Sequence, residues 1–227
     1  MEKVGIIFAM KEELDALLEY LTINNEYEIF DLKFYEGIIN NVTCILVESG
    51  VGKVNAARTT QILIDNMNVD CIFNIGVAGG VDSSLKVMDV VIGEKLVQHD
   101  FDITAFNHEK GYIPNVGKFI DGDDYLLNIA KSTIYDDTYK VGVIASGDIF
   151  CTDIVMSNKI NKKFNALAVE MEGASVAQVC FLSHIPFLII RSISDIPSGN
   201  NTLTYEEFLN KSSKKVAYMM NEILKNI

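Results

Sequence analysis

Short apolar segments rich in valine and isoleucine recur along the chain, with amphipathic stretches between them. Most of these segments are continuously apolar rather than alternating, which is typical of strands that are covered on both faces. We expect strands at residues 4–10, 42–49, 70–80, 88–98, 139–147, 167–171 and 187–193.

The stretches between the strands carry apolar residues at helical spacing. In the first of them, Leu14, Leu17, Leu18 and Leu21 follow the i, i+3, i+4, i+7 pattern of one buried helix face. We expect helices at residues 11–21, 55–67, 123–135, 173–184 and 204–227.

The alternation of strands and helices predicts the fold class. Residues 28–48 indicate a β-hairpin, with Asn40 and Asn41 able to adopt positive φ in its turn. Strands alternating with helices predict an α/β protein, a three-layer α/β/α arrangement around a mixed central sheet. Because the chain has no repeat and no linker rich in proline, glycine or serine, we expect a single domain spanning residues 1–227.

Composition narrows the classes of partner. The chain has 227 residues, of which 49% are hydrophobic, so it can bury a substantial core. Its net charge is −12, and Arg58 and Arg191 are its two arginines. Binding to nucleic acid or to anionic lipid needs clustered basic residues. We therefore expect no nucleic-acid partner and no membrane partner.

Cysteines, histidines and the first residues bear on metal binding and location. The cysteines lack ligand spacing and lie mostly in or beside apolar runs, which indicates reduced, buried thiols. The histidines form no HExxH-like pattern, so we expect no metal site. The first apolar run is too short for a signal peptide or a membrane span, and we expect a cytoplasmic protein. These residues are Cys44, Cys71, Cys151 and Cys180, and His99, His108 and His184.

Carboxylates and glycine turns follow several predicted strands. In open α/β sheets, ligands bind beyond the carboxyl ends of the strands. Taken singly, each carboxylate has a structural explanation, such as complementing a helix dipole or capping a turn. The glycine turns match neither GxGxxG nor GxxxxGK[ST], which disfavours dinucleotide or nucleoside triphosphate binding. The carboxylates are Glu13, Glu172 and Asp195, and the turns are 48–57, 74–80 and 145–148.

Taken together, these motifs resemble one enzyme family. The segments GIIFAMKEELDALL, ESGVGKVNAA, NIGVAGG, HDFDITAF, SGDIFC, AVEMEGAS and RSISD occur in that order. They resemble the 5'-methylthioadenosine/S-adenosylhomocysteine nucleosidases of the purine nucleoside phosphorylase and uridine phosphorylase superfamily. VEMEGAS with RSISD carries the superfamily likeness, and AMKEE indicates a nucleosidase rather than a phosphorylase. The resemblance implies a nucleoside phosphorylase-like fold.

The resemblance implies hydrolysis of an adenosine N-glycosidic bond, without a metal or organic cofactor. This cleavage builds positive charge on the ribose and negative charge on the purine, so it calls for an acid, a base and anchors. By the family likeness, Asp195 protonates N7 of the purine and Ser194 helps to hold it. Glu13 activates water, and Glu172 accepts hydrogen bonds from the ribose hydroxyls while Met171 packs on the sugar.

The same likeness assigns the base and the turn beside it. Phe150 stacks on adenine, and the backbone of Cys151 reads its Watson–Crick edge. The backbone turn formed by Val77, Ala78 and Gly79 approaches the ligand.

The 5' substituent requires an apolar slot, and part of it is expected to come from a second chain. Val51, Ile103 and Tyr205 would line this slot. Three further residues match a segment that family members lend across a dimer interface, which implies a homodimer. Arg191 matches an arginine near the carboxylates and the water, with a structural ion pair as the alternative. The three dimer residues are Phe106, His108 and Pro114.

Three positions depart from the family pattern, and three other functions stay open. Val77 stands where a hydroxyl residue is common, His108 where tyrosine is frequent, and Phe8 where glycine is frequent. A phosphorylase would use phosphate in place of water, and its phosphate site would call for arginines. A second alternative is a nucleosidase for another 5'-modified adenosine, such as aminofutalosine. The third is a nucleoside-binding module without activity.

Overall fold

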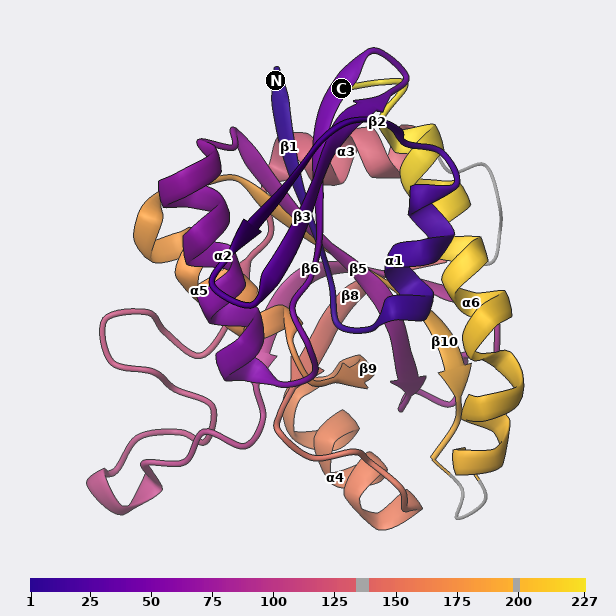
Figure 1. Cartoon of the computed structure of the whole chain (residues 1–227). Helices are drawn as coiled ribbons and strands as arrows, with labels where there is room; N and C mark the ends of the chain where they lie inside the picture. The colour runs from indigo at the N-terminus through magenta and orange to yellow at the C-terminus, as the bar shows by residue number, and fades with distance from the viewer. Residues whose placement is uncertain (134–138, 198–200) are drawn as a thin grey trace.

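A computed structural model describes residues 1–133, 139–197 and 201–227, the side chains of 201–203 excepted. Within this part of the chain, ten strands form one mixed sheet (Figure 1). The strands are β1 (Lys3–Phe8), β2 (Thr22–Ile29), β3 (Leu32–Ile39), β4 (Val42–Glu48), β5 (Cys71–Gly80), β6 (Val90–Gln98), β7 (Ile120–Asp121), β8 (Tyr139–Ser146), β9 (Ala166–Glu170) and β10 (Phe187–Asp195).

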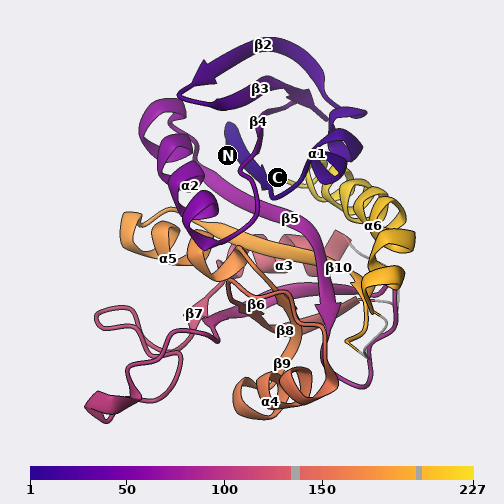
Figure 2. The ribbon, with the colours of Figure 1, turned by 60° about the horizontal axis from the view of Figure 1, so that its bottom comes forward.

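The long strand β5 organises the sheet. It pairs in parallel with β1 over its first four residues and with β10 from Ile72 to Gly79, and its last residues, Gly79 and Gly80, pair antiparallel with β9. Because β10 pairs with β6, β6 with β8 and β8 with β9, five strands close into a ring. From β1 the sheet continues through β4 and β3 to β2 at its open edge (Figure 2).

Helices cover both faces of the sheet, as the sequence predicted. The helices α2 (Lys53–Met67) and α5 (Gly173–Ser183) pack on one face, and α1 (Lys11–Leu18), α3 (Asp124–Thr133) and α6 (Asn201–Ile223) pack on the other. Each face has its own buried apolar core, so the three-layer α/β/α prediction is confirmed. None of the helices in the described ranges is long and apolar enough to span a membrane.

Most elements lie where the hydrophobic pattern predicts them, but β2, α4 (Ile154–Phe164) and the short elements η1 (Thr104–Phe106) and β7 were missed. The turn between β3 and β4 has φ of 48° at Asn40 and 67° at Asn41, as expected. Strand β2 was missed over most of its length because all but its last residue are exposed at the sheet edge, which removes the apolar signal. Helix α4 (Ile154–Phe164) was also missed. It buries only three residues, although the Asp153 side chain caps its amino end.

Three helices end on a residue other than glycine in the left-handed region. The residue after α2 is Asn68 with φ of 52°, the residue after α4 is Asn165 with 53°, and the residue after α5 is His184 with 56°. Glycine is the usual residue at such positions, because a Cβ is unfavourable there.

A long excursion connects β6 to β7. Residues 99–119 extend away from the sheet and contain the 3-10 helix η1 (Thr104–Phe106), which lies at the far lower left of Figure 1. Phe106 at its tip is 76% exposed. His108 stacks on Tyr112 with ring centroids 4.6 Å apart, so this excursion is partly held by its own side chains.

Candidate active site

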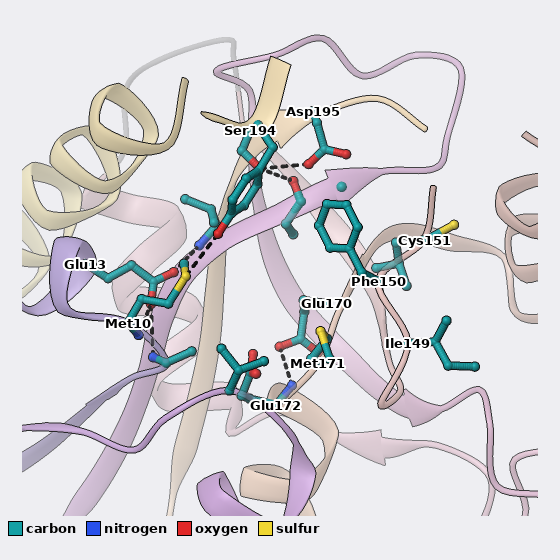
Figure 3. Close-up of a pocket in the computed structure, with 17 residues that line it drawn as sticks. Met10, Glu13, Ile149, Phe150, Cys151, Glu170, Met171, Glu172, Ser194 and Asp195 are labelled. Carbon is teal, nitrogen blue, oxygen red and sulfur yellow. Dashed lines mark hydrogen bonds between the residues drawn. The ribbon is translucent and has the colours of Figure 1, made fainter. Parts of the chain in front are cut away.

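A pocket opens where the carboxyl ends of β1, β5, β9 and β10 meet. About 550 Å³ of space, part of it open to solvent, lies between its walls. Figure 3 shows carboxylates at its sides and an aromatic pair across it. The lining residues are Ala9, Met10, Glu13, Val51, Val77, Ala78, Gly79, Ile149, Phe150, Cys151, Val169, Glu170, Met171, Glu172, Ser194, Asp195 and Tyr205.

Glu13 is held by three backbone amides on the wall of this pocket. Its Oε2 accepts hydrogen bonds from the amides of Ala9 at 3.0 Å and Met10 at 3.1 Å. Its Oε1 accepts one from the amide of Val77 at 2.9 Å. Burial raises the pKa of Glu13 against the opposing effects of Arg191 and these amides. A buried carboxylate with a raised pKa is a better base at neutral pH.

Val77 therefore has a role that its side chain did not suggest. It stands where the family often has a hydroxyl group, and its own side chain is apolar. The hydrogen bond to Glu13 at this position comes from the backbone, so it does not depend on the side chain. Phe8, the other departure within the sheet, is fully buried in the core.

Asp195 ends β10 on another wall of the pocket. Its side chain is 2% exposed, and the Ser194 hydroxyl donates a hydrogen bond to its Oδ1 at 2.9 Å. The same Ser194 oxygen lies 3.4 Å from the backbone oxygen of Ala78 on β5. The serine thus fixes the orientation of the carboxyl group relative to two strands.

Glu172 is the third predicted carboxylate, and it sits at the amino end of α5. Its Oε1 accepts a hydrogen bond from the amide of Gly52 at 2.7 Å. Burial, followed by repulsion from Glu170, raises its pKa to about 8, while Arg191 and the Gly52 amide act in the opposite direction. Glu13 adds to the repulsion. The negative charge at this site is therefore only partly compensated.

Next to Glu172 lies a buried ion pair between Arg191 and Glu170. Nη2 of Arg191 contacts Oε2 of Glu170 at 2.5 Å, and both side chains are 2% exposed. Arg191 also donates to the backbone and side-chain oxygens of Asn74. Oε1 of Glu170 accepts a hydrogen bond from the Ser146 hydroxyl, and its Oε2 also accepts from the amides of Glu172 and Gly173. Arg191 does not line the pocket. It forms a structural ion pair, which was the alternative to a role near the water.

Two aromatic side chains, Phe150 and Tyr205, also line the pocket. Phe150 and Tyr205 meet edge to face with ring centroids 5.6 Å apart. The Tyr205 hydroxyl contacts the sulfur of Met10 at 3.0 Å, and burial raises the pKa of that hydroxyl. Phe150 is 41% exposed, and Cys151 beside it is buried, which raises its thiol pKa to about 11. A flat apolar ligand would fit against the Phe150 ring.

The structure brings most of the predicted residues to one pocket and leaves five outside it. The pocket contains the three predicted carboxylates and nine of the other predicted residues. Ile103 is half-buried, while Phe106, His108 and Pro114 are exposed on the excursion between β6 and β7. These four residues and Arg191 do not line the pocket within one chain.

Five lining residues were not predicted: Ala9, Met10, Ile149, Val169 and Glu170. Ala9 and Met10 precede Glu13, and Ile149 precedes Phe150, so each adjoins a predicted residue. Glu170 lies two positions before Glu172, on the strand side of the same motif. Adjacency to the motifs was the available signal, since nothing else in the sequence marks these positions.

Charge decides what the pocket can do. Among the described residues that line it, four are carboxylic acids and none is lysine or arginine. Such a site favours a ligand that develops positive charge and disfavours an anion such as phosphate. Among the described residues, no group of three or more His, Cys, Asp and Glu side chains is arranged to hold a metal ion.

Comparison with known proteins gives one consistent family. Residues 3–225 match the model of the phosphorylase superfamily. The chain is 40% identical to a 5'-methylthioadenosine/S-adenosylhomocysteine nucleosidase of Staphylococcus carnosus, over 99% of this chain and 100% of that protein.

Solved structures agree in fold. A nucleosidase of this kind from Helicobacter pylori, in complex with a pyrrolidine inhibitor, has a TM-score of 0.96 and 35% identity, covering 100% of this chain and 99% of that one. The futalosine hydrolase of Helicobacter pylori also has a TM-score of 0.96 with 35% identity, over 100% of this chain and 98% of that one.

Proposed function

Since the chain belongs to the phosphorylase superfamily, in the branch of its 5'-methylthioadenosine/S-adenosylhomocysteine nucleosidases, we propose that this pocket is its active site. The protein is an N-glycosyl hydrolase that cleaves 5'-methylthioadenosine and S-adenosylhomocysteine, giving adenine and the thioribose product. The whole chain, residues 1–227, would form one nucleosidase domain. The observation that carries the proposal is a pocket with four buried acids and, among its described lining residues, no basic one.

In our proposal, the purine leaves with a proton from Asp195. Departure of adenine places negative charge on the base, and protonation at N7 neutralises it. The hydrogen bond from Ser194 to Oδ1 supports this role, because it fixes the orientation of the carboxyl group. Phe150 would stack on adenine, and the backbone of Cys151 would read its polar edge.

Water would attack the ribose with Glu13 as its base. The three amides that bind Glu13 fix its position, and burial raises its pKa, so it can take a proton from water at neutral pH. Glu172 would accept the ribose hydroxyl hydrogens, with Met171 against the sugar. In their ionised form, the two buried carboxyl groups beside the sugar also stabilise the positive charge of the transition state.

The 5' substituent would lie in the apolar part of the pocket near Val51, Met10 and Tyr205. We propose that Ile103, Phe106, His108 and Pro114 complete a 5' slot across a homodimer. The exposed Phe106 and the extended shape of its segment support an interface there. We also propose a cytoplasmic location and a role in methionine salvage.

A phosphorylase reaction is the other candidate, and the pocket argues against it. Phosphate would require basic donors. Arg191 lies outside the pocket lining, and it already forms an ion pair with Glu170 and a hydrogen bond to Asn74. A 5'-modified adenosine such as aminofutalosine stays a reasonable further substrate, because a relative of equal similarity is named futalosine hydrolase.

The test is adenine release from 5'-methylthioadenosine, S-adenosylhomocysteine and adenosine, each with and without phosphate. We expect release that does not depend on phosphate, with a free thioribose product and faster turnover of the two thio-substituted nucleosides. Strict dependence on phosphate, with a ribose 1-phosphate product, would overturn the role of Glu13.

A further inference from the structure

Three segments that are separate in sequence meet beside the pocket at Lys53. They are the amino end of α2, the end of β6 with the residues that follow it, and the residues after β8. Strands β6 and β8 pair in parallel as far as Gln98 and Ser146, and beyond that point their chains leave the sheet. Side-chain interactions therefore help to fix the geometry of these three segments relative to one another.

The ammonium group of Lys53 binds residues at and just beyond the carboxyl end of β6. Its Nζ lies 2.7 Å from Oδ1 of Asp100 and 3.1 Å from Oε1 of Gln98. The Lys53 side chain is 17% exposed and that of Asp100 is 20% exposed, so solvent screens this ion pair less than a surface pair. The hydrogen bonds from Lys53 and the Asp148 amide hold the pKa of Asp100 below its usual range although burial opposes them.

The residues after β8 close the arrangement. The backbone amide of Lys53 donates to Oδ1 of Asp148 at 2.8 Å. The backbone amide of Asp148 in turn donates to Oδ2 of Asp100 at 3.0 Å. Lys53, Asp100 and Asp148 thus form a cyclic arrangement in which each residue contacts the other two, and we call it the Lys53 clamp.

The clamp adjoins the pocket on two sides. Gly52, the residue before Lys53, gives its amide to Glu172 at 2.7 Å, on the ribose side. Asp148 directly precedes Ile149 and Phe150, which line the base side. A shift of the clamp would therefore move the donor to Glu172 and the wall for the base together.

We propose that Lys53 and Asp100 are positioning residues, which set the spacing between the ribose carboxylate and the base-binding segment without touching the substrate. This inference rests on the proposed function. Small displacements of groups that orient a substrate are costly, on the order of a hundredfold per ångström in unfavourable cases. An ion pair that only stabilised the fold would change the melting temperature and leave substrate binding unaltered.

The test compares Lys53→Met, Asp100→Ala and the double variant with the wild type. Lys95→Met is the matched control, because Lys95 forms an ion pair with Asp121 at 3.6 Å that does not adjoin the pocket. We would measure KM and kcat for 5'-methylthioadenosine, the Kd of adenine by calorimetry, and the melting temperature. Wild-type turnover tests the proposed function, whereas adenine binding tests the clamp without requiring any turnover.

We expect each single variant to raise KM and the Kd of adenine by about tenfold, with a smaller change in kcat. The KM and the Kd of adenine of the double variant should not exceed those of the more strongly affected single variant, because both changes break the same clamp. Should Lys53→Met fail to fold, Lys53→Gln and Asp100→Asn carry the same expectation. Binding constants within twofold of the wild type, or effects that multiply in the double variant, would overturn the proposal.

Discussion

The absence of a side chain at Gly76 makes room for the carboxylate of Glu13. A Cβ on Gly76 would lie 2.4 Å from Oε1 of Glu13 and 2.8 Å from its carboxyl carbon. Both positions are buried, and the carboxylate is already bound by amides on either side. The glycine in strand β5 therefore decides where the proposed base can stand.

Replacing Gly76 by alanine should displace Glu13 and reduce catalysis. We expect kcat to fall about a hundredfold, because the base can no longer lie in line with its water. Steady-state kinetics on 5'-methylthioadenosine measures the effect. Gly142→Ala is the control, since its Cβ would meet the end of the Leu167 side chain at 2.8 Å, a less crowded contact that lies outside the pocket. Equal losses in both variants would show that crowding alone is responsible.

The two proposed proton-transfer groups should be separable by single substitutions. Asp195→Asn and Glu13→Gln should each lower kcat by about 10²- to 10⁴-fold, because each removes one proton transfer. Glu13→Gln should still bind the nucleoside. The control is Glu12→Gln, an exposed carboxylate next to Glu13. Near-normal turnover by Asp195→Asn would refute its role as the acid, and normal turnover by Glu13→Gln would remove that residue from the mechanism.

Glu172 should make the stability of the free protein depend on pH. Burial and Glu170 raise its pKa from 4.5 to about 8, so the folded protein binds this proton more tightly than the unfolded chain. The stabilisation is complete below pH 4.5 and is lost as pH rises towards and through 8. Glu172→Gln removes the titration and keeps an oxygen for the Gly52 amide.

Denaturant unfolding at pH 5 and pH 8 measures this effect. Relative to the wild type, Glu172→Gln should gain free energy of unfolding between the two values, on the order of 3 kcal/mol. Titrating groups that do not interact with Glu172 are common to both proteins and cancel in the comparison. A difference between the proteins that is the same at both pH values would contradict the assignment.

Phe106 should be required for the homodimer. Phe106→Ser removes the exposed ring from the end of the excursion, and we expect a shift towards the monomer mass with a higher KM. Sedimentation at several concentrations measures the mass, given 25.2 kDa for one chain. The matched control is Phe30→Ser, since Phe30 is 77% exposed on the turn after β2. A monomeric wild type with full activity would exclude a site completed across a dimer.

The sequence predicted the layers and the carboxylates for physical reasons. Continuously apolar runs mark strands buried on both faces, so β1, β5 and β10 were evident. Strand β2 gave no such signal, because its side chains face solvent. Glu13, Glu172 and Asp195 follow strands, and parallel strands bring their carboxyl ends together, which predicted a common site.

Side-chain partners were beyond the reach of the sequence. The pairing of Arg191 with Glu170 depends on the register between β10 and its neighbours, and a linear pattern does not specify register. The amide of Val77 could not be recognised as a partner of Glu13, because every residue except proline has one. Lys53 stood within a recognised motif, but its contact with Asp100 joins residues 47 positions apart.

The left-handed residues after α2, α4 and α5 mark where this protein could be engineered for thermal resistance. Asn68, Asn165 and His184 lie outside the lining of the pocket, and each keeps its Cβ in a conformation that glycine adopts without steric strain. Evolution has left this gain unused at all three helix ends, as expected for a protein that needs only enough stability to function. Glycine at these positions would raise the melting temperature, and it would do so without changing any residue that lines the pocket.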